Sequence, residues 1–432
     1  MRTADAVVVG AGVIGAAIAL ELARAGRSVV VVDKAAGIGH GSTSASSAIV
    51  RFHYSTRTAV ALAWEARHCW EDWRGHLGHD DPDGLAGFVR TGMLVLEPDP
   101  KVSAATTTHF DVVGVPWERW SAHEVRQRAP FLDVGAYGPP KPVASDEFFA
   151  PARGVIGGTW TPDAGYVDDA TLAAHNLAAA ARRHGAGFQL RHEVTGLEPA
   201  GSRRWRVHTR HLEGSEAIDC DVLVNAAGPW SGAVNALAGA GADFAVTSRP
   251  LRQEVHWLPA PSQEALTLAL ADPDLGVYLR PTTAGILVGG MEPECDPLEW
   301  LVRPEDADQH VTAATYQAQS VRAARRVRDL RVPNRPTGIV GVYDVSTDWA
   351  PIYDRTALPG YYVAMGTSGN QFKNAPVVGQ LMAALVAAVE GGHDHDRDPL
   401  VWTAPRTGQR LALSTYSRLR RVDPDAPTSV MG

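Results

Sequence analysis

Residues 6–33 read AVVVGAGVIGAAIALELARAGRSVVVVD, and this is the most informative stretch of the chain. An apolar run reaches Gly10, a GxGxxG turn follows at Gly10, Gly12 and Gly15, and an apolar helix leads to a second apolar run that ends at Asp33. In such a turn the first glycine permits the tight bend, the second lets the backbone approach a pyrophosphate, and the third lets the helix pack on the strand. The pattern predicts a strand, a helix and a strand that bind a dinucleotide.

The two ends of this segment indicate how the nucleotide is bound. The helix begins after Gly12, so its free N–H groups and positive dipole end would face the phosphates. A carboxylate about 20 residues after the glycines accepts hydrogen bonds from a ribose and disfavours a ribose phosphate. Asp33 therefore argues against NADP. A signal peptide or a membrane span fits poorly, because the apolar run is short and Asp5 and Glu21 bracket it.

The composition is that of an ordinary globular protein. A length of 432 residues allows two or three domains and a large core. The formal net charge of −8 gives no electrostatic reason to expect nucleic acid or an anionic membrane as a partner. Cys69, Cys220 and Cys295 are far apart, so neither a disulfide framework nor a metal site is expected, and a reducing cytoplasm is the default. No other run approaches about 20 apolar residues, which predicts a soluble protein.

Further elements follow along the chain. The sequence predicts a helix over 58–75, whose three tryptophans share a core-facing side, an insertion rich in Pro and Gly turns over 80–141, a helix over 168–184 and a helical stretch over 304–329. HDHDRD at 393–398 offers alternating His and Asp ligands for a metal. It follows a Gly-Gly helix stop, so it is interpreted as a solvated loop.

Two later segments narrow the dinucleotide to a flavin. DVLVNAAGPWSG, at 221–232, predicts a buried strand that enters a small-residue turn and a helix, so that a second backbone segment passes beside the nucleotide. GYYVAMGTSGNQFKNAPVVGQLMAAL, at 360–385, predicts a strand, a glycine-punctuated loop and a helix that begins near Asn374. A helix N-terminus aimed at the pyrimidine edge of a flavin would stabilise the negative charge that develops on reduction. NAD-dependent enzymes need no such C-terminal piece.

With these segments, the chain resembles the D-amino-acid oxidase and sarcosine oxidase family of FAD-dependent oxidoreductases. The matching pieces keep the family order and are GAGVIGAAIALELARAG with VVVVDK, GHGSTSASSAIVRFHY, VDDATLAAHNLAAAARRHGA, VLVNAAGPWS, GVYLRPTTAGILVGG and GTSGNQFKNAPVVG. The resemblance is nearest to the branch of sarcosine oxidase, dimethylglycine oxidase and amino-acid dehydrogenases. It implies an α/β fold, α+β overall, in which a Rossmann-like FAD-binding domain is interleaved with a substrate domain built on a large mixed β-sheet.

The resemblance implies discontinuous domains. Residues 1–87, 151–240 and 333–432 would form the FAD-binding domain, and residues 88–150 and 241–332 the substrate-binding domain. It also implies that FAD contacts residues spread over all the matching pieces: Gly10, Gly12, Val13, Ile14, Gly15, Asp33, Lys34, Gly41, Ser42, Thr43, Ser46, Ser47, Val194, Ala227, Gly228, Trp230, Gly341, Gly366, Ser368, Gly369, Asn370, Gln371, Phe372 and Lys373.

The segment after the serine-rich loop carries the first candidates for substrate binding. In similar sarcosine oxidases, the arginine at the place of Arg51 binds the substrate carboxylate together with a lysine that matches Lys373. An arginine fork and a lysine point charge near the flavin would orient the neighbouring carbon. Alternatively, each cation pairs with a surface acid. His53 and Tyr54 are candidates for substrate contact or for support of such contacts, although a buried, hydrogen-bonded histidine is the more common state.

Further candidates lie in the substrate domain. Tyr278 and Arg280 alternate by two on a predicted strand, which puts both side chains on one face, and that face is expected to line the cavity over the flavin. Gln253 is a weaker candidate of the same kind. Tyr343 lies where related enzymes bring a strand to the flavin, and a place in the core is the alternative.

Two residues depart from the family pattern. Where monomeric sarcosine oxidases have the cysteine that tethers FAD, this chain aligns Gly341, so the flavin is predicted to be non-covalent. Where oxidases of that pattern place a lysine that assists the reaction with oxygen, this chain aligns Leu287. Oxygen as the electron acceptor is therefore in doubt.

These observations predict a cytoplasmic oxidoreductase that removes a hydride from the carbon next to nitrogen in a small amine, an amino acid or an N-alkyl amino acid. The hydride would go to flavin N5, and the imine product would hydrolyse. Positioning and exclusion of water would carry most of this chemistry. The alternatives are an FAD-dependent 2-hydroxy acid dehydrogenase, and the flavin subunit of a heteromeric amino-acid dehydrogenase or oxidase complex. A homo-oligomer is a further possibility.

Overall fold

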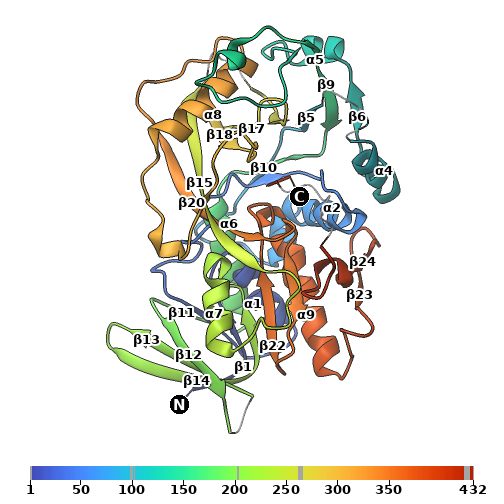
Figure 1. Ribbon diagram of the computed structural model, residues 1–432. Helices are drawn as coiled ribbons and strands as arrows, with labels where there is room; N and C mark the ends of the chain where they lie inside the picture. The colour runs from blue at the N-terminus through green and yellow to red at the C-terminus, as the bar shows by residue number, and fades with distance from the viewer. Residues whose placement is uncertain are drawn as a thin grey trace.

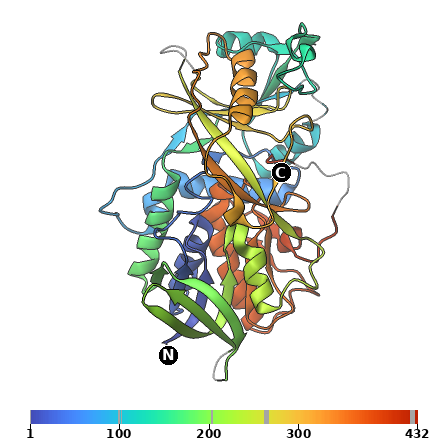
Figure 2. The same cartoon turned by 60° about the vertical axis from the view of Figure 1, so that its left-hand side comes forward.

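The computed structural model describes residues 2–97, 101, 103–201, 204–260, 266–422 and 429–431. Two large β-sheets form its two halves (Figures 1 and 2). The half that carries the N-terminus contains the glycine-rich turn and the long apolar helices. In both views the C-terminal end lies between the halves, far from the N-terminus.

An eight-stranded mixed sheet forms the first half. Its parallel centre has the order β11, β2, β1, β14, β22, and β13, β12 and β21 add antiparallel edges. The strands at the centre are almost continuous apolar runs, as expected of parallel strands covered on both faces. Their bounds are β1 Arg2–Val9, β2 Val29–Asp33, β11 Gly187–Leu190, β12 Glu193–Pro199, β13 Trp205–His211, β14 Gly214–Asn225, β21 Ile352–Arg355 and β22 Tyr361–Met365.

Three helices cover one face of this sheet: α1 (Val13–Arg24), α6 (Ala170–Arg183) and α9 (Ala375–Glu390). α1 lies against both of the other helices, and glycines allow its close approach. A Cβ on Gly15 would lie 1.9 Å from the carbonyl oxygen of Gly10, and one on Gly379 would lie 2.5 Å from that of Ala17. The third glycine of the turn therefore has the packing role that the sequence predicts.

The expectation that no further run approaches membrane-spanning length is wrong for Phe372–Glu390, which is long and apolar enough to cross a bilayer. In this structure 61% of that segment is buried inside the protein. Its helix α9 packs on α1, which is typical of a core helix, and such a segment by itself is weak evidence for a membrane span.

A nine-stranded sheet forms the second half, in the order β19, β15, β18, β17, β16, β5, β9, β6, with β20 paired to β15. Helix α8 (Ala313–Arg326) packs on its outer side through Tyr316 and Ala323, against Leu279 and Val288. The opposite face of the same strands is turned toward the first half. The bounds are β5 Met93–Glu97, β6 Glu118–Trp120, β9 Gly157–Thr161, β15 Ser248–Pro259, β16 Ala269–Asp272, β17 Val277–Pro281, β18 Gly285–Gly290, β19 Glu299–Trp300 and β20 Gly338–Ser346.

Smaller elements complete the described part of the chain. A three-stranded sheet has the order β3, β10, β4, and β23 pairs with β24, as β7 pairs with β8. The bounds are β3 Ile49–Val50, β4 Phe88–Arg90, α4 Ala104–Val113, α5 Ala122–Arg128, β7 Gly135–Ala136, β8 Gly154–Val155, β10 Gly165–Val167, α7 Ser231–Ala238, β23 Val401–Thr403 and β24 Arg410–Ala412.

Two predicted helices differ from the structure. The helix predicted over 58–75 is divided into α2 (Arg57–Glu71) and α3 (Trp73–Leu77), because Asp72 leaves helical geometry and its carboxylate caps α3 at the Gly75 N–H. The stretch predicted over 304–329 contains only a short 3₁₀ turn and then α8, which begins after the capping residue Thr312.

The other two local expectations have mixed outcomes. The three tryptophans of 64–73 are core residues, and the rings of Trp70 and Trp73 stack with centroids 4.3 Å apart. The 393–398 segment forms turns, but His395 within it is buried, 3.4 Å from the carboxylate of Asp354. It is therefore not solvated throughout.

The predicted domain boundaries remain a prediction. Two strands, β9 and β20, belong to a different sheet from the one that the predicted ranges imply. The predicted ranges place β9 and β20 in the FAD-binding domain. Both strands hydrogen-bond within the nine-stranded sheet: β9 pairs with β5 and β6, and β20 pairs along most of β15. Short local runs do not reveal which of two sheets a strand will join, because that choice depends on distant partners.

Candidate functional site

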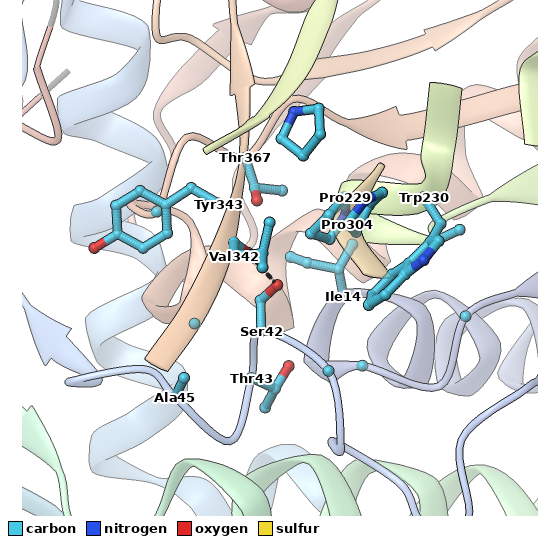
Figure 3. Close-up of a pocket in the computed structure, with 18 of the residues that line it drawn as sticks. Ile14, Ser42, Thr43, Ala45, Pro229, Trp230, Pro304, Val342, Tyr343 and Thr367 are labelled. Carbon is cyan, nitrogen blue, oxygen red and sulfur yellow. Dashed lines mark hydrogen bonds between the residues drawn. The ribbon is translucent and has the colours of Figure 1, made fainter. Parts of the chain in front are cut away.

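A cavity of about 860 Å³ lies between the two sheets. The glycine-rich turn, the loop 40–51, the AAGPW turn, strands β15, β17 and β20, and the loop 367–373 supply its wall. The volume is near the upper end of the range for small-molecule and cofactor sites. Figure 3 shows Ile14, Pro229, Trp230 and Pro304 gathered on one side of this cavity and Tyr343 on the other.

The glycine-rich turn is shaped for a pyrophosphate. Gly10 has a φ of +110°, and a Cβ there would lie 2.3 Å from the carbonyl oxygen of Ala226. Gly12 is the N-cap of α1 and provides no side-chain acceptor for the first-turn N–H groups. Such groups and the positive end of the helix dipole bind phosphate. The turn, with Val13 and Ile14, lines the cavity and has the geometry of a dinucleotide pyrophosphate site.

Asp33, at the end of β2, also lines the cavity. Its carboxylate accepts hydrogen bonds from the N–H groups of Ala11, at 2.6 Å, and Ala35, at 2.7 Å. These bonds fix the side chain at the carboxyl end of the strand, where a ribose is bound in folds of this kind.

The serine-rich loop joins the two halves of the protein. Thr43 Oγ1 accepts the Val13 N–H at 3.1 Å, and Ser42 Oγ donates to the Val342 carbonyl of β20 at 2.6 Å (Figure 3). Ser47 Oγ is 2.8 Å from the Tyr278 hydroxyl of β17. Short polar side chains at these places therefore hold the serine-rich loop against the second sheet.

Lys34 and Trp230 form the opposite wall with a residue that sequence reasoning missed. The Lys34 ammonium lies 4.1 Å from the centre of the Trp230 ring and 2.5 Å from a carboxylate oxygen of Glu305, and Trp230 Nε1 also donates to Glu305. Pro304 and Glu305 line the cavity although they belong to the second half. No local motif marks them.

Arg51 and Lys373 come together around Tyr54. The Arg51 guanidinium lies 4.7 Å and the Lys373 ammonium 5.2 Å from the centre of the Tyr54 ring, while the Tyr54 hydroxyl donates to the Asn370 carbonyl at 2.7 Å. Arg51 donates to the carbonyls of His53 and Val430, and Lys373 donates to the Asn370 carbonyl at 2.6 Å. Both cations line the cavity.

Among the residues that the structure describes, no acid neutralises Arg51 or Lys373. Arg51 is 5% exposed and Lys373 is 3% exposed, and within the described ranges neither forms an ion pair with a carboxylate. Burial lowers the pKa of Arg51, and burial together with the nearby Arg51 lowers the pKa of Lys373 well below its ordinary value. Buried charge is costly without a counter-charge, so an anionic ligand would be bound strongly here.

Tyrosines from the second sheet close the cavity beside these cations. Tyr278 and Tyr343 line it, as does Gln253. Burial raises the pKa of both phenols, so they stay protonated at neutral pH and can donate hydrogen bonds. A Cβ on Gly369 would lie 2.4 Å from the Tyr343 ring, so this glycine makes room for it.

Some predicted site residues lie behind the cavity wall. Tyr54 supports the two cations as described. Neither nitrogen of the buried His53 has a hydrogen-bond partner in the described part of the chain, and the His53 ring packs edge-on against Phe110 with centroids 5.0 Å apart. Burial and, as the second cause, the charge of Arg51 lower the pKa of His53 to about 3, so its imidazole is neutral. Arg280 shares a face with Tyr278 but stacks on Tyr166, 4.0 Å from the ring centre, and donates to the Ser47 carbonyl.

Gly15, Gly366 and Ser368 also lie off the wall. Gly15 packs α1 on the sheet, and Gly366 and Ser368 have φ values of +66° and +47° in the bend after β22. The Asp344 carboxylate accepts the Gly366 N–H, and the Asp344 carbonyl accepts that of Ser368 at 2.8 Å. These two residues shape the loop, whereas its later part lines the cavity.

The structure brings the remaining predicted residues to the cavity: Gly10, Gly12, Val13, Ile14, Asp33, Lys34, Gly41, Ser42, Thr43, Ser46, Ser47, Arg51, Val194, Ala227, Gly228, Trp230, Gln253, Tyr278, Gly341, Tyr343, Gly369, Asn370, Gln371, Phe372 and Lys373. Gly341, where a tethering cysteine would align, faces Ala45, since a Cβ there would lie 2.8 Å from the Ala45 methyl group. Leu287 is in β18 and is not among the described residues that line the cavity.

The fold and parts of the sequence resemble known flavoproteins. FAD-dependent oxidoreductase domain-containing protein 1 of Mus musculus is 27% identical over 213 residues, which are 45% of this chain and 41% of that protein. This chain thus matches about two-fifths of that relative's length. Glycine oxidase of Geobacillus kaustophilus is 25% identical over 90% of this chain and 94% of that protein.

Solved structures show the same fold. The crystal structure of L-proline dehydrogenase from P. horikoshii superposes with a TM-score of 0.74 at 22% identity, over 97% of this chain and 98% of that one. The crystal structure of the Geobacillus glycine oxidase gives 0.70 at 24% identity, over 92% and 98%. The DAO family model, described as FAD dependent oxidoreductase, matches residues 5–385. The chain therefore belongs to the DAO family of FAD-dependent oxidoreductases, and its cofactor is FAD.

Proposed function

We propose that this protein oxidises a small amino acid or N-alkyl amino acid at the carbon next to nitrogen. The observation that carries the proposal is the pair of buried cations, Arg51 and Lys373, which line the cavity without a carboxylate partner among the described residues. A ligand carboxylate would supply the missing counter-charge. The Arg51 fork is suited to bind two oxygens, and the Lys373 ammonium acts as a point charge beside it.

The residues around this pair would position the ligand. Tyr54 lies against both cations, and Tyr278 and Tyr343, whose phenols stay protonated, line the same cavity. FAD, when bound in this cavity, would supply the two-electron acceptor for oxidation of an amine to an imine, and the residues named above would hold and orient the substrate. The protein needs no nucleophile for this chemistry, because orientation and exclusion of water supply most of the rate.

Two similar proteins support the choice of an amine over another substrate. Glycine oxidase and L-proline dehydrogenase carry the names of amino acids in their own names. The carboxylate clamp alone would also serve a 2-hydroxy acid, so the nitrogen is the part of the proposal that most needs a test.

The test is anaerobic mixing of the purified holoprotein with matched amino acids and 2-hydroxy acids, followed by the flavin absorbance. We expect amino acids or N-alkyl amino acids to bleach the flavin. Bleaching by the hydroxy acids alone would contradict the proposal and favour a hydroxy-acid dehydrogenase. Reduced flavin that oxygen reoxidises only slowly, together with co-purifying subunits, would identify a component of a larger dehydrogenase complex.

A further inference from the structure

The residue Val430 hydrogen-bonds to one acidic and one basic side chain. Its carbonyl oxygen accepts a hydrogen bond from Arg51 Nη2 at 2.5 Å, and its N–H donates to Glu292 Oε2 at 3.0 Å. Val430 and Met431 line the cavity, and the C-terminal end lies between the two halves of the protein (Figures 1 and 2). One residue of the chain thus spans the space between a carboxylate and a guanidinium.

The atoms of Val430 that make these contacts form the skeleton of an α-amino acid. Its nitrogen, Cα, carbonyl carbon and carbonyl oxygen are linked as the amine nitrogen, Cα and carboxylate are linked in the free molecule. The Val430 N–H points to the Glu292 carboxylate, and the Val430 carbonyl oxygen points to the Arg51 guanidinium. A free α-amino acid in the same orientation would place its ammonium at Glu292 and its carboxylate at Arg51, with full charges in place of a peptide dipole.

Glu292 lies just behind the cavity wall, where Gln253 and Val430 hydrogen-bond to its carboxylate. It follows β18, with a φ of +50° that is uncommon for a residue with a side chain. Gln253 Nε2 donates to its other oxygen, Oε1, at 3.1 Å, and no ion pair to Glu292 occurs in the described part of the chain. Burial raises the pKa of this carboxyl to about 8. Tyr278, Tyr343 and Gln253, which surround it, all line the cavity.

We propose that Glu292 binds the substrate amine while Arg51 binds the carboxylate, so that the site selects α-amino and N-alkyl-α-amino acids over carboxylates that lack a basic nitrogen. The proposal rests on the proposed function and names its specificity-determining residue. Val430 makes the same two contacts, so it must leave them when such a ligand binds. Glu292 itself does not line the cavity, because Gln253 and Val430 cover its carboxylate.

The experiment compares ligands that differ only at the nitrogen. N-methylglycine is paired with methoxyacetate, and proline with tetrahydrofuran-2-carboxylate. Affinity for the amino member comes from the concentration dependence of anaerobic flavin reduction, and affinity for the oxygen member from the perturbation of the flavin spectrum. The variants are Glu292→Gln and the matched control Glu294→Gln, which makes the same change at an exposed position two residues away. FAD content and melting temperature verify folding.

We expect Glu292→Gln to weaken binding of the amino member about 10- to 100-fold and that of the oxygen member less than about 3-fold, since a charge-assisted contact is lost only with the amine. Glu294→Gln should change neither. Wild-type protein that binds the two members equally well, or a Glu292→Gln variant that weakens both equally, overturns the role of Glu292. Failure of every amino acid to reduce the wild-type flavin overturns the proposed function as well, so the two failures are distinguishable.

Discussion

The close contact between α1 and β1 makes Gly15 a sharp test of how the cofactor is bound. In Gly15→Ala, the new methyl group would lie 1.9 Å from the carbonyl oxygen of Gly10, a distance that carbon atoms essentially never show. The two atoms nearest to the new methyl group, Gly10 O and Gly10 C, belong to the backbone and cannot rotate away. The helix and the turn must therefore separate by about 1 Å. Overpacking of this kind costs ~1–3 kcal/mol of folding free energy, and the better helix propensity of alanine offsets ~1 kcal/mol of it.

The larger effect should fall on FAD. A shift of about 1 Å moves the first N–H groups of α1 away from the pyrophosphate, and loss of hydrogen bonds to a charged group costs ~1.5–3 kcal/mol. We therefore expect the dissociation constant for FAD to rise about 10- to 100-fold, measured by titration of apoprotein with FAD. Gly154→Ala is the control, because a Cβ at Gly154 meets nothing within 4 Å. Wild-type affinity and melting temperature in Gly15→Ala would refute the packing argument.

Three further results are expected. Lys373→Met should keep the fold, since the buried ammonium has no ion pair in the described ranges. The variant should bind methoxyacetate ~10-fold or more weakly in a flavin spectral titration. Unchanged binding would show that Lys373 does not bind the carboxylate. Burial raises the pKa of Asp344 from 3.8 to about 6, so the protonated carboxyl favours folding only at low pH, and this advantage is lost as pH rises from about 4 to 6. Asp344→Asn should therefore gain ~3 kcal/mol relative to wild type between pH 4 and pH 7 in denaturant unfolding, and a pH-independent difference would contradict this. Denaturation should release all the FAD, because none of the three cysteines lines the cavity in the described part of the chain, whereas FAD that stays with the protein would show a covalent link.

The cofactor half could be predicted from the sequence because its signals are local. The glycine turn and Asp33 follow from a short motif whose geometry is fixed by the backbone, the serine-rich loop was assigned through the family resemblance, and all of them reach the cavity. Arg51 and Lys373 came from family resemblance, since nothing in their neighbours shows that segments 322 positions apart meet around one tyrosine.

The missed residues are those that only the tertiary fold brings to the site. Glu305 and Glu292 follow no motif, and their importance depends on Trp230, Gln253 and Val430, which lie far away in the sequence. His53 shows the limit in the other direction. Its place beside Arg51 made it a candidate, and the structure packs its neutral ring against Phe110 behind the cavity wall, so a direct substrate contact stays a prediction.

The most direct test of the central claim is to count products in a single anaerobic turnover. Holoprotein is mixed with excess amino acid, and the ammonia or alkylamine released is compared with the amount of flavin reduced. We expect one nitrogen product for each flavin bleached, with the matched 2-hydroxy acid giving neither signal. Flavin reduction without release of a nitrogen product, or reduction by the hydroxy acid alone, would contradict it.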